Sequence, residues 1–332
     1  MKAMKAYVLE DASCVTLGSV TLDEVPMPEP GPGEALVKVH AVGLNPVDCK
    51  LVASHDDAWT YPHVLGLDAA GEIVALGEGV DDHWKVGMRV SCHGDLRRNG
   101  SFAQYVAEPT YALALIPEGV TYETAAGLLC SAMTAYQAIN RKPNLNLVRT
   151  ALIQGGSGAV GGIALQLAKM HGVTTFTTCS TGKMDAVREL EPDAVIDYRT
   201  EDVSTRIDEL TDGMGVDLVV DTVSAVEATR DLDRLAYNGQ LVSIVGTPEP
   251  QPGALFERAL SVEMVNLGGA HASGNPAEQR DLGTIATDLL QMASMGRIDP
   301  LVHTVLPFER LTDGLALLTD HQVTGKVVVT LD

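Results

Sequence analysis

The chain has 332 residues, more than one hydrophobic core usually supports, so we expect two domains. Hydrophobic residues make up 45% and charged residues 20% of it, which is typical of a folded globular protein and excludes a disordered or fibrous one. The net charge of −21 opposes binding to nucleic acid. No apolar run approaches the roughly 20 residues of a membrane-spanning helix, and the N-terminus lacks the apolar core of a signal peptide. We therefore expect a cytoplasmic protein without a membrane partner.

The cysteines are few and scattered, without a C-x-x-C pair. They are Cys14, Cys49, Cys92, Cys130 and Cys179. Their odd number and wide spacing predict neither a disulfide framework nor a structural zinc site, so we interpret them as buried thiols.

Residues 5 to 120 have the pattern of short β-strands. Every second position between Glu34 and Val42 holds a small apolar residue, the period of two that is typical of a half-buried strand. Prolines and glycines interrupt the sequence on both sides. This pattern predicts an all-β region.

From about Thr121 strands alternate with helices, which is typical of a doubly wound parallel sheet in an α/β domain. The predicted strands are Ala151–Gln154, Val173–Thr178, Ala194–Ile196, Leu218–Asp221 and Gln240–Val245. Past Asn275 we expect a long helix, a second helix over Pro307–Thr319, and a strand over Lys326–Leu331. This last strand resembles the first region more than the second.

One motif indicates a cofactor. Gly156, Ser157, Gly158, Ala159, Val160 and Gly161 form a complete G-x-G-x-x-G between a predicted strand and a predicted helix. In that position the first glycine permits a tight turn, the second lets the backbone approach a pyrophosphate, and the third lets the helix pack on the strand. The N–H groups of the helix N-terminus then face the anion. This arrangement predicts dinucleotide binding.

The residues after the second predicted strand distinguish NAD from NADP. A carboxylate about 20 residues after the glycine motif would bind the ribose 2′-hydroxyl of NAD. The window from Thr175 to Met184 contains no acid and offers Ser180, Thr181 and Lys183, which suit a 2′-phosphate. We therefore predict NADP(H). The alternative for Ser180 and Lys183 is a solvated turn that caps the next helix.

Several short motifs in a fixed order resemble the medium-chain dehydrogenase/reductase superfamily, and within it the zinc-independent NADPH:quinone oxidoreductase branch. The resemblance covers nearly the whole chain. The matching stretches are Gly43–Asp48, Pro62–Gly71, Thr134–Tyr136, the glycine motif, Asp197–Arg199, Asp299–Leu301, Pro307–Glu309 and Thr324–Val328.

The resemblance implies a Rossmann domain over residues 126–270, inserted into a GroES-like, mostly β catalytic domain over residues 1–125 and 271–332. It also implies a homodimer formed by pairing of edge strands, for which Val262–Leu267 is the candidate. By position, Ser180, Lys183 and Tyr198 would hold the 2′-phosphate. The residues near the nicotinamide would be Asn45, Thr134, Val245, Gly246 and Lys326.

The positions of a catalytic zinc site can be compared with the family. Zinc-dependent members have cysteine where this chain has Asn45 and histidine where it has Leu67, while the third ligand position holds Cys130. Leucine cannot bind a metal, and catalytic zinc needs three protein ligands. We therefore expect no metal, and we interpret Cys130 as a small buried hydrophobic residue.

Without a metal, the chemistry that fits is hydride transfer from NADPH to an electrophilic small molecule, a quinone or an enone. Asn45 and Asp48 are candidates to position this acceptor or the cofactor ribose, although Asp48 could equally cap the turn after Pro46. Tyr61 is a candidate proton donor, with a structural role as its alternative. Two other functions stay open: a zinc-dependent alcohol dehydrogenase that uses Cys130, and a non-catalytic NADPH-binding or redox-sensing protein.

Overall fold

A computed structural model describes residues 2–331, and the chain forms two compact units. Unit 1 contains the residues up to Met133 and resumes at Leu267, and unit 2 is Thr134–Asn266, inserted in sequence between these two segments. Within the described residues, no helix is both long enough and apolar enough to cross a bilayer.

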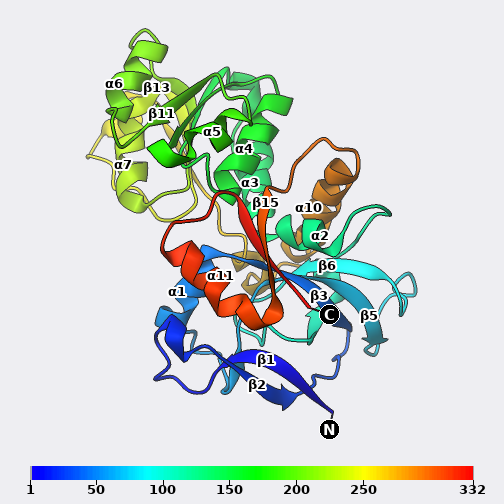
Figure 1. The fold of residues 1–332 in the computed structure, drawn as a ribbon. Coiled ribbons are helices and arrows are strands. Elements are labelled where there is room, and N and C mark those ends of the chain that lie inside the picture. Colours follow the sequence, from blue (N-terminus) through cyan, green and yellow to red (C-terminus); the bar gives the residue numbers. More distant parts are fainter. Residues whose placement is uncertain (1, 332) are drawn as a thin grey trace. The chain divides into compact units, whose positions relative to one another are not determined.

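Unit 1 is built mainly on antiparallel β-structure (Figure 1). Its larger sheet has the strand order β15-β16-β3-β5-β6-β8, with β7 also paired to β3, and its smaller sheet has the order β2-β1-β4. The strands are β1 (Ala3–Leu9), β2 (Thr21–Pro26), β3 (Glu34–Leu44), β4 (His63–Val64), β5 (Asp68–Leu76), β6 (Arg89–His93), β7 (Tyr105–Pro109), β8 (Leu113–Leu115), β15 (Val302–Pro307) and β16 (Lys326–Thr330). The alternating strand predicted from Glu34 is therefore the centre of the larger sheet.

The last strand of the chain returns to the first segment. β16 pairs antiparallel with β3, with Val328 opposite Gly43, and in Figure 1 the red C-terminal strand lies beside the blue one. This agrees with the prediction that the last strand resembles the first region more than the second.

Unit 1 also contains helices, and two predictions for this unit were wrong in detail. The helices are α1 (Pro46–Ser54), α2 (Tyr122–Gly127), α3 (Cys130–Tyr136, which continues into unit 2), α9 (Gly269–Ala272), α10 (Pro276–Ser294) and α11 (Leu311–Thr319). Helix α1 lies in the region predicted as all-β, because Pro46 at its first position and a capping carboxylate start a short helix that has no apolar stripe. Pro307 ends β15, so the predicted last helix begins only after it, at a short 3-10 turn (Phe308–Arg310).

Unit 2 is a six-stranded sheet in which every neighbouring pair is parallel. The order β11-β10-β9-β12-β13-β14 is that of a Rossmann sheet, which confirms the predicted doubly wound architecture. The strands are β9 (Thr150–Ile153), β10 (Thr174–Cys179), β11 (Ala194–Asp197), β12 (Val216–Asp221), β13 (Leu235–Ser243) and β14 (Ser261–Met264). The strand predicted over Val262–Leu267 corresponds to β14 at one edge of this sheet, but it begins one residue earlier and ends at Met264.

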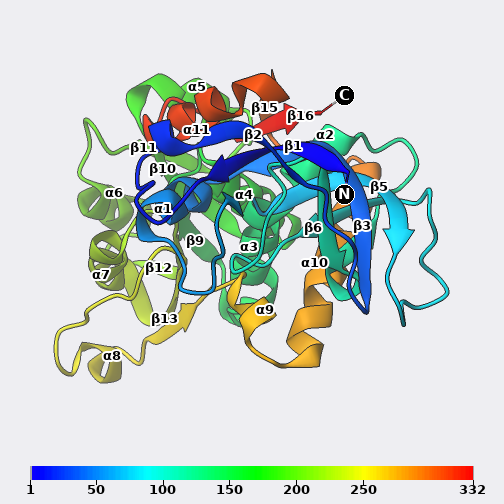
Figure 2. The ribbon, with the colours of Figure 1, turned by 90° about the horizontal axis from the view of Figure 1, so that it is seen from below.

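Helices connect these strands. They are α4 (Ala159–Met170), α5 (Met184–Arg188), α6 (Val203–Leu210), α7 (Ala225–Arg234) and α8 (Ala254–Glu257). Helices α6 and α7 contact one another and lie side by side in both views (Figure 2). Because the strands are parallel, the segments that follow their carboxyl ends meet at one edge of the sheet, where ligands of such folds bind.

Candidate functional site

The carboxyl edge of the unit 2 sheet brings together most of the residues predicted to bind the cofactor. The glycine motif follows β9, Ser180 and Lys183 follow β10, Tyr198 follows β11, and Val245 and Gly246 lie just after β13. Val245 is 40% exposed and Tyr198 is 49% exposed, so apolar and aromatic surface is available at this edge. Thr134 is buried within helix α3.

The three glycines of the motif differ in what surrounds them. A Cβ atom at Gly156 would lie 2.2 Å from the Thr177 hydroxyl oxygen, and one at Gly161 would lie 2.3 Å from the carbonyl oxygen of Gly155. A Cβ at Gly158 would meet only that same carbonyl oxygen, at an ordinary 3.4 Å. Gly156 and Gly161 are therefore required by the protein's own packing, whereas Gly158 leaves open space at the N-terminus of α4. This is the place where a bound pyrophosphate needs room.

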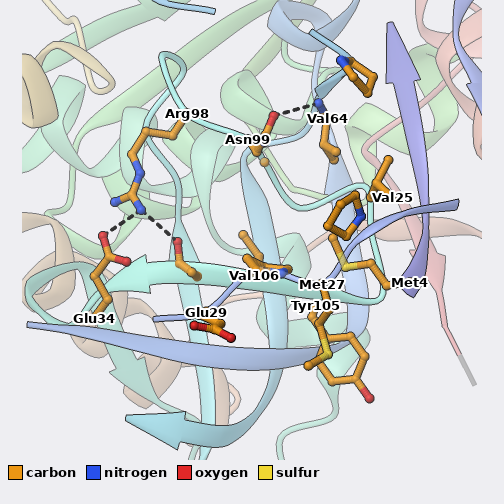
Figure 3. A pocket seen from close by; sticks show the side chains of 15 residues that line it. Met4, Val25, Met27, Glu29, Glu34, Val64, Arg98, Asn99, Tyr105 and Val106 are labelled. Carbon is orange, nitrogen blue, oxygen red and sulfur yellow. Dashed lines mark hydrogen bonds and ion pairs between the residues drawn. The ribbon is translucent and has the colours of Figure 1, made fainter. Parts of the chain in front are cut away.

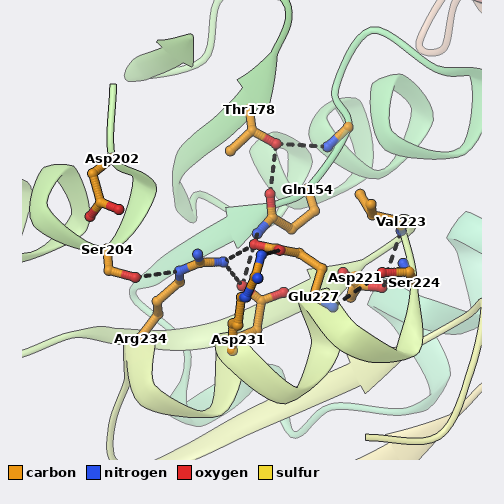
Figure 4. Close-up of polar contacts among 12 residues, drawn as sticks. Gln154, Thr178, Asp202, Ser204, Asp221, Val223, Ser224, Glu227, Asp231 and Arg234 are labelled. Carbon is orange, nitrogen blue, oxygen red and sulfur yellow. Dashed lines mark hydrogen bonds and ion pairs between the residues drawn. The ribbon is translucent and has the colours of Figure 1, made fainter. Parts of the chain in front are cut away.

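A chain of hydrogen bonds supports the glycine motif from behind (Figure 4). The backbone N–H of Gly155 donates to the Thr178 hydroxyl (3.0 Å), and Thr178 donates to Gln154 Oε1 (2.6 Å). Gln154 Nε2 donates in turn to the buried carboxylate of Asp231 (2.8 Å), which is paired with Arg234 (2.6 Å). The turn before the motif is thereby tied to helix α7.

Sequence reasoning missed this support, because the residues joined by these hydrogen bonds between strands and helix are 23 to 77 positions apart. Burial raises the pKa of Asp231, and Arg234 opposes that rise. Polar residues at the ends of β9 and β10 were the only signal in the sequence.

At the ribose end, the structure adds a carboxylate that the window of residues 175 to 184 does not contain. Asp197 ends β11 directly opposite Cys179, the last residue of β10. Its Oδ2 accepts a hydrogen bond from the Thr181 hydroxyl at 2.6 Å. An acid therefore lies close to the predicted 2′-phosphate residues, although it comes from the neighbouring strand.

Unit 1 holds a second polar group, around Lys326. The Lys326 ammonium donates to Asn45 Oδ1 (2.5 Å) and to Asp68 Oδ2 (3.0 Å), and Asn45 Nδ2 donates to the same Asp68 oxygen (2.9 Å). The other Asp68 oxygen accepts from the backbone N–H of Cys130 (3.0 Å). All three charged or amide side chains are almost fully buried, so each depends on the others for partners. We call Asn45, Asp68 and Lys326 the lysine cluster.

Asp48 lies beside the lysine cluster and caps helix α1. One of its carboxylate oxygens accepts the backbone N–H of Asn45 at 2.8 Å, and the other has no partner among the described residues. Burial, with the nearby carboxylate of Asp68, raises the pKa of Asp48 to about 8. The geometry is that of the capping role weighed from the sequence as the alternative to positioning the acceptor.

Tyr61 lies elsewhere in unit 1. Its hydroxyl forms a 2.5 Å hydrogen bond with His55 Nδ1, and the ring belongs to an aromatic group with Trp59 and His63. Partial burial and nearby Asp11 raise the pKa of Tyr61. No hydrogen bond between described residues joins Tyr61 to the lysine cluster.

The positions of the family's zinc ligands do not form a metal site here. Leu67 has no ligand atom, and the Asn45 oxygen faces an ammonium that would repel a dication. Cys130 is only partly buried, which corrects its interpretation as a buried hydrophobic residue; Cys14 and Cys49 are partly buried too. Within residues 2–331, no group of three or more His, Cys, Asp and Glu side chains is arranged to hold a metal. These residues do not fit a catalytic zinc ion.

A cavity of about 450 Å³ lies in unit 1, away from the lysine cluster (Figure 3). Its walls include Met4, Met27 and Val106, and of the charged residues that line it, Arg98 is paired with Glu34 at 2.6 Å and the third is Glu29.

Comparisons with known proteins agree with this geometry. Residues 31–118 match the family model of the alcohol dehydrogenase GroES-like domain, and residues 190–329 match that of zinc-binding dehydrogenases. The chain is 30% identical over 319 residues to the synaptic vesicle membrane protein VAT-1 homolog of Rattus norvegicus, covering 91% of this chain and 78% of the relative. It is 27% identical over 305 residues to a quinone oxidoreductase-like protein 2 homolog of Nematostella vectensis, covering 90% and 82%. The structure of a mycobacterial quinone oxidoreductase matches with a TM-score of 0.84 and 28% identity over 99% of this chain and 100% of the other.

The open space at Gly158 generates a prediction. Gly158→Val should leave the protein folded and abolish dinucleotide binding, because its methyl groups would fill the space that a pyrophosphate needs. Thermal unfolding and calorimetric titration with NADPH check both parts. Gly156→Ala is the contrasting variant and should unfold at a lower temperature, since its Cβ would collide with Thr177. Unchanged NADPH affinity in Gly158→Val would remove the motif from the site.

The buried carboxyl group of Asp48 generates a prediction about pH. Its folded pKa of about 8 exceeds the unfolded value of roughly 3.9, so its contribution to stability is full below pH 4 and is lost as the pH rises to about 8. Asp48→Asn cannot ionise, so its free energy of unfolding relative to the wild type should rise by at least about 1.4 kcal/mol between pH 4.5 and pH 8. Urea unfolding across this range measures the difference. Asp82 is exposed, so Asp82→Asn serves as the control, and its free energy of unfolding should change with pH as that of the wild type does. If the free energy of unfolding of Asp48→Asn also changed with pH as that of the wild type does, Asp48 would ionise freely in the fold.

Proposed function

Because this chain belongs to the medium-chain dehydrogenase/reductase superfamily, in its quinone oxidoreductase-like branch, we propose that it is a metal-independent, NADPH-dependent reductase of quinones or α,β-unsaturated carbonyl compounds. Membership makes it an oxidoreductase that uses a nicotinamide dinucleotide. The observation that carries the proposal is the carboxyl edge of unit 2, where the open space at Gly158 suits the pyrophosphate of NADPH and the side chains of Ser180 and Lys183 suit its 2′-phosphate.

The residues of unit 2 bind and orient the cofactor in this proposal. The N-terminus of α4 holds the pyrophosphate, and Ser180, Lys183 and Tyr198 hold the 2′-phosphate by charge-assisted hydrogen bonds. The bound nicotinamide supplies a hydride. Val245 offers apolar surface at the same edge, which suits a nicotinamide ring.

The residues of unit 1 stabilise negative charge on the acceptor. A lysine ammonium has three donors, and the named partners of Lys326 are Asn45 and Asp68. We assign the third donor to the acceptor oxygen, on which charge develops when a hydride reaches a quinone or an enone. In a buried site such a fixed charge is worth more than in water. Asn45 then acts by orienting Lys326, and Asp48 by fixing the helix that begins after Asn45.

Assembly and location are also proposals. Edge strand β14 could pair with its counterpart in a second copy, which would give the expected homodimer, and we keep the expectation of a cytoplasmic enzyme that binds neither nucleic acid nor membranes.

Oxidation of NADPH and NADH against a panel of quinones, enals and enones tests this function. We expect turnover with at least one of these acceptors, and a kcat/KM for NADPH at least about tenfold above that for NADH, since a charge-assisted contact contributes roughly 1.5–3 kcal/mol. Lys183→Ala should lose most of this preference. Lys169→Ala is the matched control, because Lys169 lies in the last turn of α4 and is paired with Glu191.

Three outcomes would contradict the proposal. Equal kcat/KM values for the two cofactors would refute NADPH as the preferred one. Oxidation of simple alcohols as efficient as enone reduction would refute the direction of reaction. Tight NADPH binding without any turnover would favour a non-catalytic, redox-sensing protein.

A further inference from the structure

Asp197 lies among the residues proposed to bind the 2′-phosphate. It is the last residue of β11, it is opposite Cys179 in the sheet, and it directly precedes Tyr198. Ser180 follows Cys179 in the same way on β10. The residue is 4% exposed, and its carboxylate contacts Thr181, in the segment that also carries Ser180 and Lys183.

The hydrogen bonds of Asp197 fix what Thr181 can offer to a ligand. Thr181 donates its hydroxyl proton to Asp197 Oδ2 at 2.6 Å, and the backbone N–H of Arg199 donates to Oδ1 at 3.0 Å. The hydrogen bond from the Thr181 hydroxyl is the main cause that holds the pKa of Asp197 below its usual range, and other hydrogen bonds contribute less. The carboxylate is therefore ionised at neutral pH. A hydroxyl has one proton, so an engaged Thr181 can only accept further hydrogen bonds.

An acceptor at this position suits one cofactor better than the other. The ribose 2′-hydroxyl of NADH can donate to Thr181, whereas the 2′-phosphate of NADPH is itself an acceptor and carries negative charge. The Asp197 carboxylate also repels that phosphate.

We propose that the Asp197–Thr181 pair is a specificity-determining element that favours an unphosphorylated ribose and thereby limits the preference of this chain for NADPH. The inference rests on the proposed function, in which Lys183 supplies the opposing attraction. Two further charged groups lie near Asp197: Arg199, whose charge helps to lower the pKa of Asp197, and Glu201, which accepts the Asp197 backbone N–H at 2.9 Å.

Two ligands that differ only in the 2′-phosphate test the pair directly. We would measure the affinities of ADP-ribose and 2′-phospho-ADP-ribose by calorimetry, which requires no turnover. Asp197→Asn removes the charge and lets the new amide donate to Thr181, whose proton is then free for the phosphate. We expect the affinity ratio to shift toward 2′-phospho-ADP-ribose by at least about fivefold.

A second variant separates the hydrogen bond from the charge. Thr181→Val retains Asp197 and removes the hydroxyl that accepts the hydrogen bond. It should lower the affinity for ADP-ribose by about threefold and leave the affinity for 2′-phospho-ADP-ribose within about twofold of the wild type. Asp193→Asn is the matched control: it makes the same charge change just before β11, at the opposite edge of the sheet, where Asp193 accepts the backbone N–H of Thr175. It should leave the ratio unchanged.

The outcomes distinguish this inference from the proposed function. A wild type that prefers 2′-phospho-ADP-ribose, with a ratio that Asp197→Asn changes no more than Asp193→Asn, would overturn the role of the pair and leave the NADPH proposal intact. A wild type without preference, in which Asp197→Asn creates one, would overturn the NADPH proposal and support the pair. If Asp197→Asn does not fold, an unchanged affinity for ADP-ribose in Thr181→Val overturns the inference.

Discussion

The buried ion pair between Lys326 and Asp68 is the interaction on which the architecture of unit 1 depends. It joins residues 258 positions apart and fixes the closing strand β16 against β3 and β5. A charge buried this deeply is tolerated only when it is paired and hydrogen-bonded, and Asn45 completes the set of partners. Gly43 makes the arrangement possible, because a Cβ atom there would lie 2.9 Å from Lys326 Cε and 3.0 Å from Asp68 Oδ2.

In unit 2 the corresponding constraint is that hydrogen bonds must hold a flexible glycine turn in one conformation. The turn donates a hydrogen bond from the Gly155 N–H to the Thr178 hydroxyl, and the chain of hydrogen bonds behind Thr178 ends at the Asp231–Arg234 pair. Packing leaves no room for a side chain at Gly156 and Gly161, whereas Gly158 leaves space for a ligand. The support is therefore rigid where the protein packs and open where the phosphate would bind.

Local patterns in the sequence were enough to predict the parallel sheet, the glycine motif and the long helix α10. They failed where the outcome depended on distant partners. Helix α1 has too few turns and too little amphipathic pattern to be recognised, and it forms because Pro46 and Asp48 start it within unit 1. The family resemblance placed Asn45 and Lys326 near one another, but it did not indicate Asp68, which meets them because β5 and β16 both pair with β3.

The ribose site shows the same limit. The expected absence of an acid holds for the window of residues 175 to 184, yet a parallel sheet places the ends of two strands side by side, so Asp197 comes from another part of the sequence. A search along one strand cannot find it. In our proposal, the cofactor preference depends on the opposing charges of Lys183 and Asp197 at this edge.

The central claim is that this chain is a reductase in which a lysine, and not a metal, supplies the fixed positive charge. Metal content measured together with activity tests this claim most directly. The purified protein would be dialysed exhaustively against a chelator, analysed for zinc, and assayed with its best quinone or enone, with Cys130→Ser in parallel. We predict substoichiometric zinc, turnover unaffected by chelation, and most of the activity retained in Cys130→Ser. Near-stoichiometric zinc whose removal abolishes activity and whose addition restores it would contradict the account and make Cys130 a metal ligand.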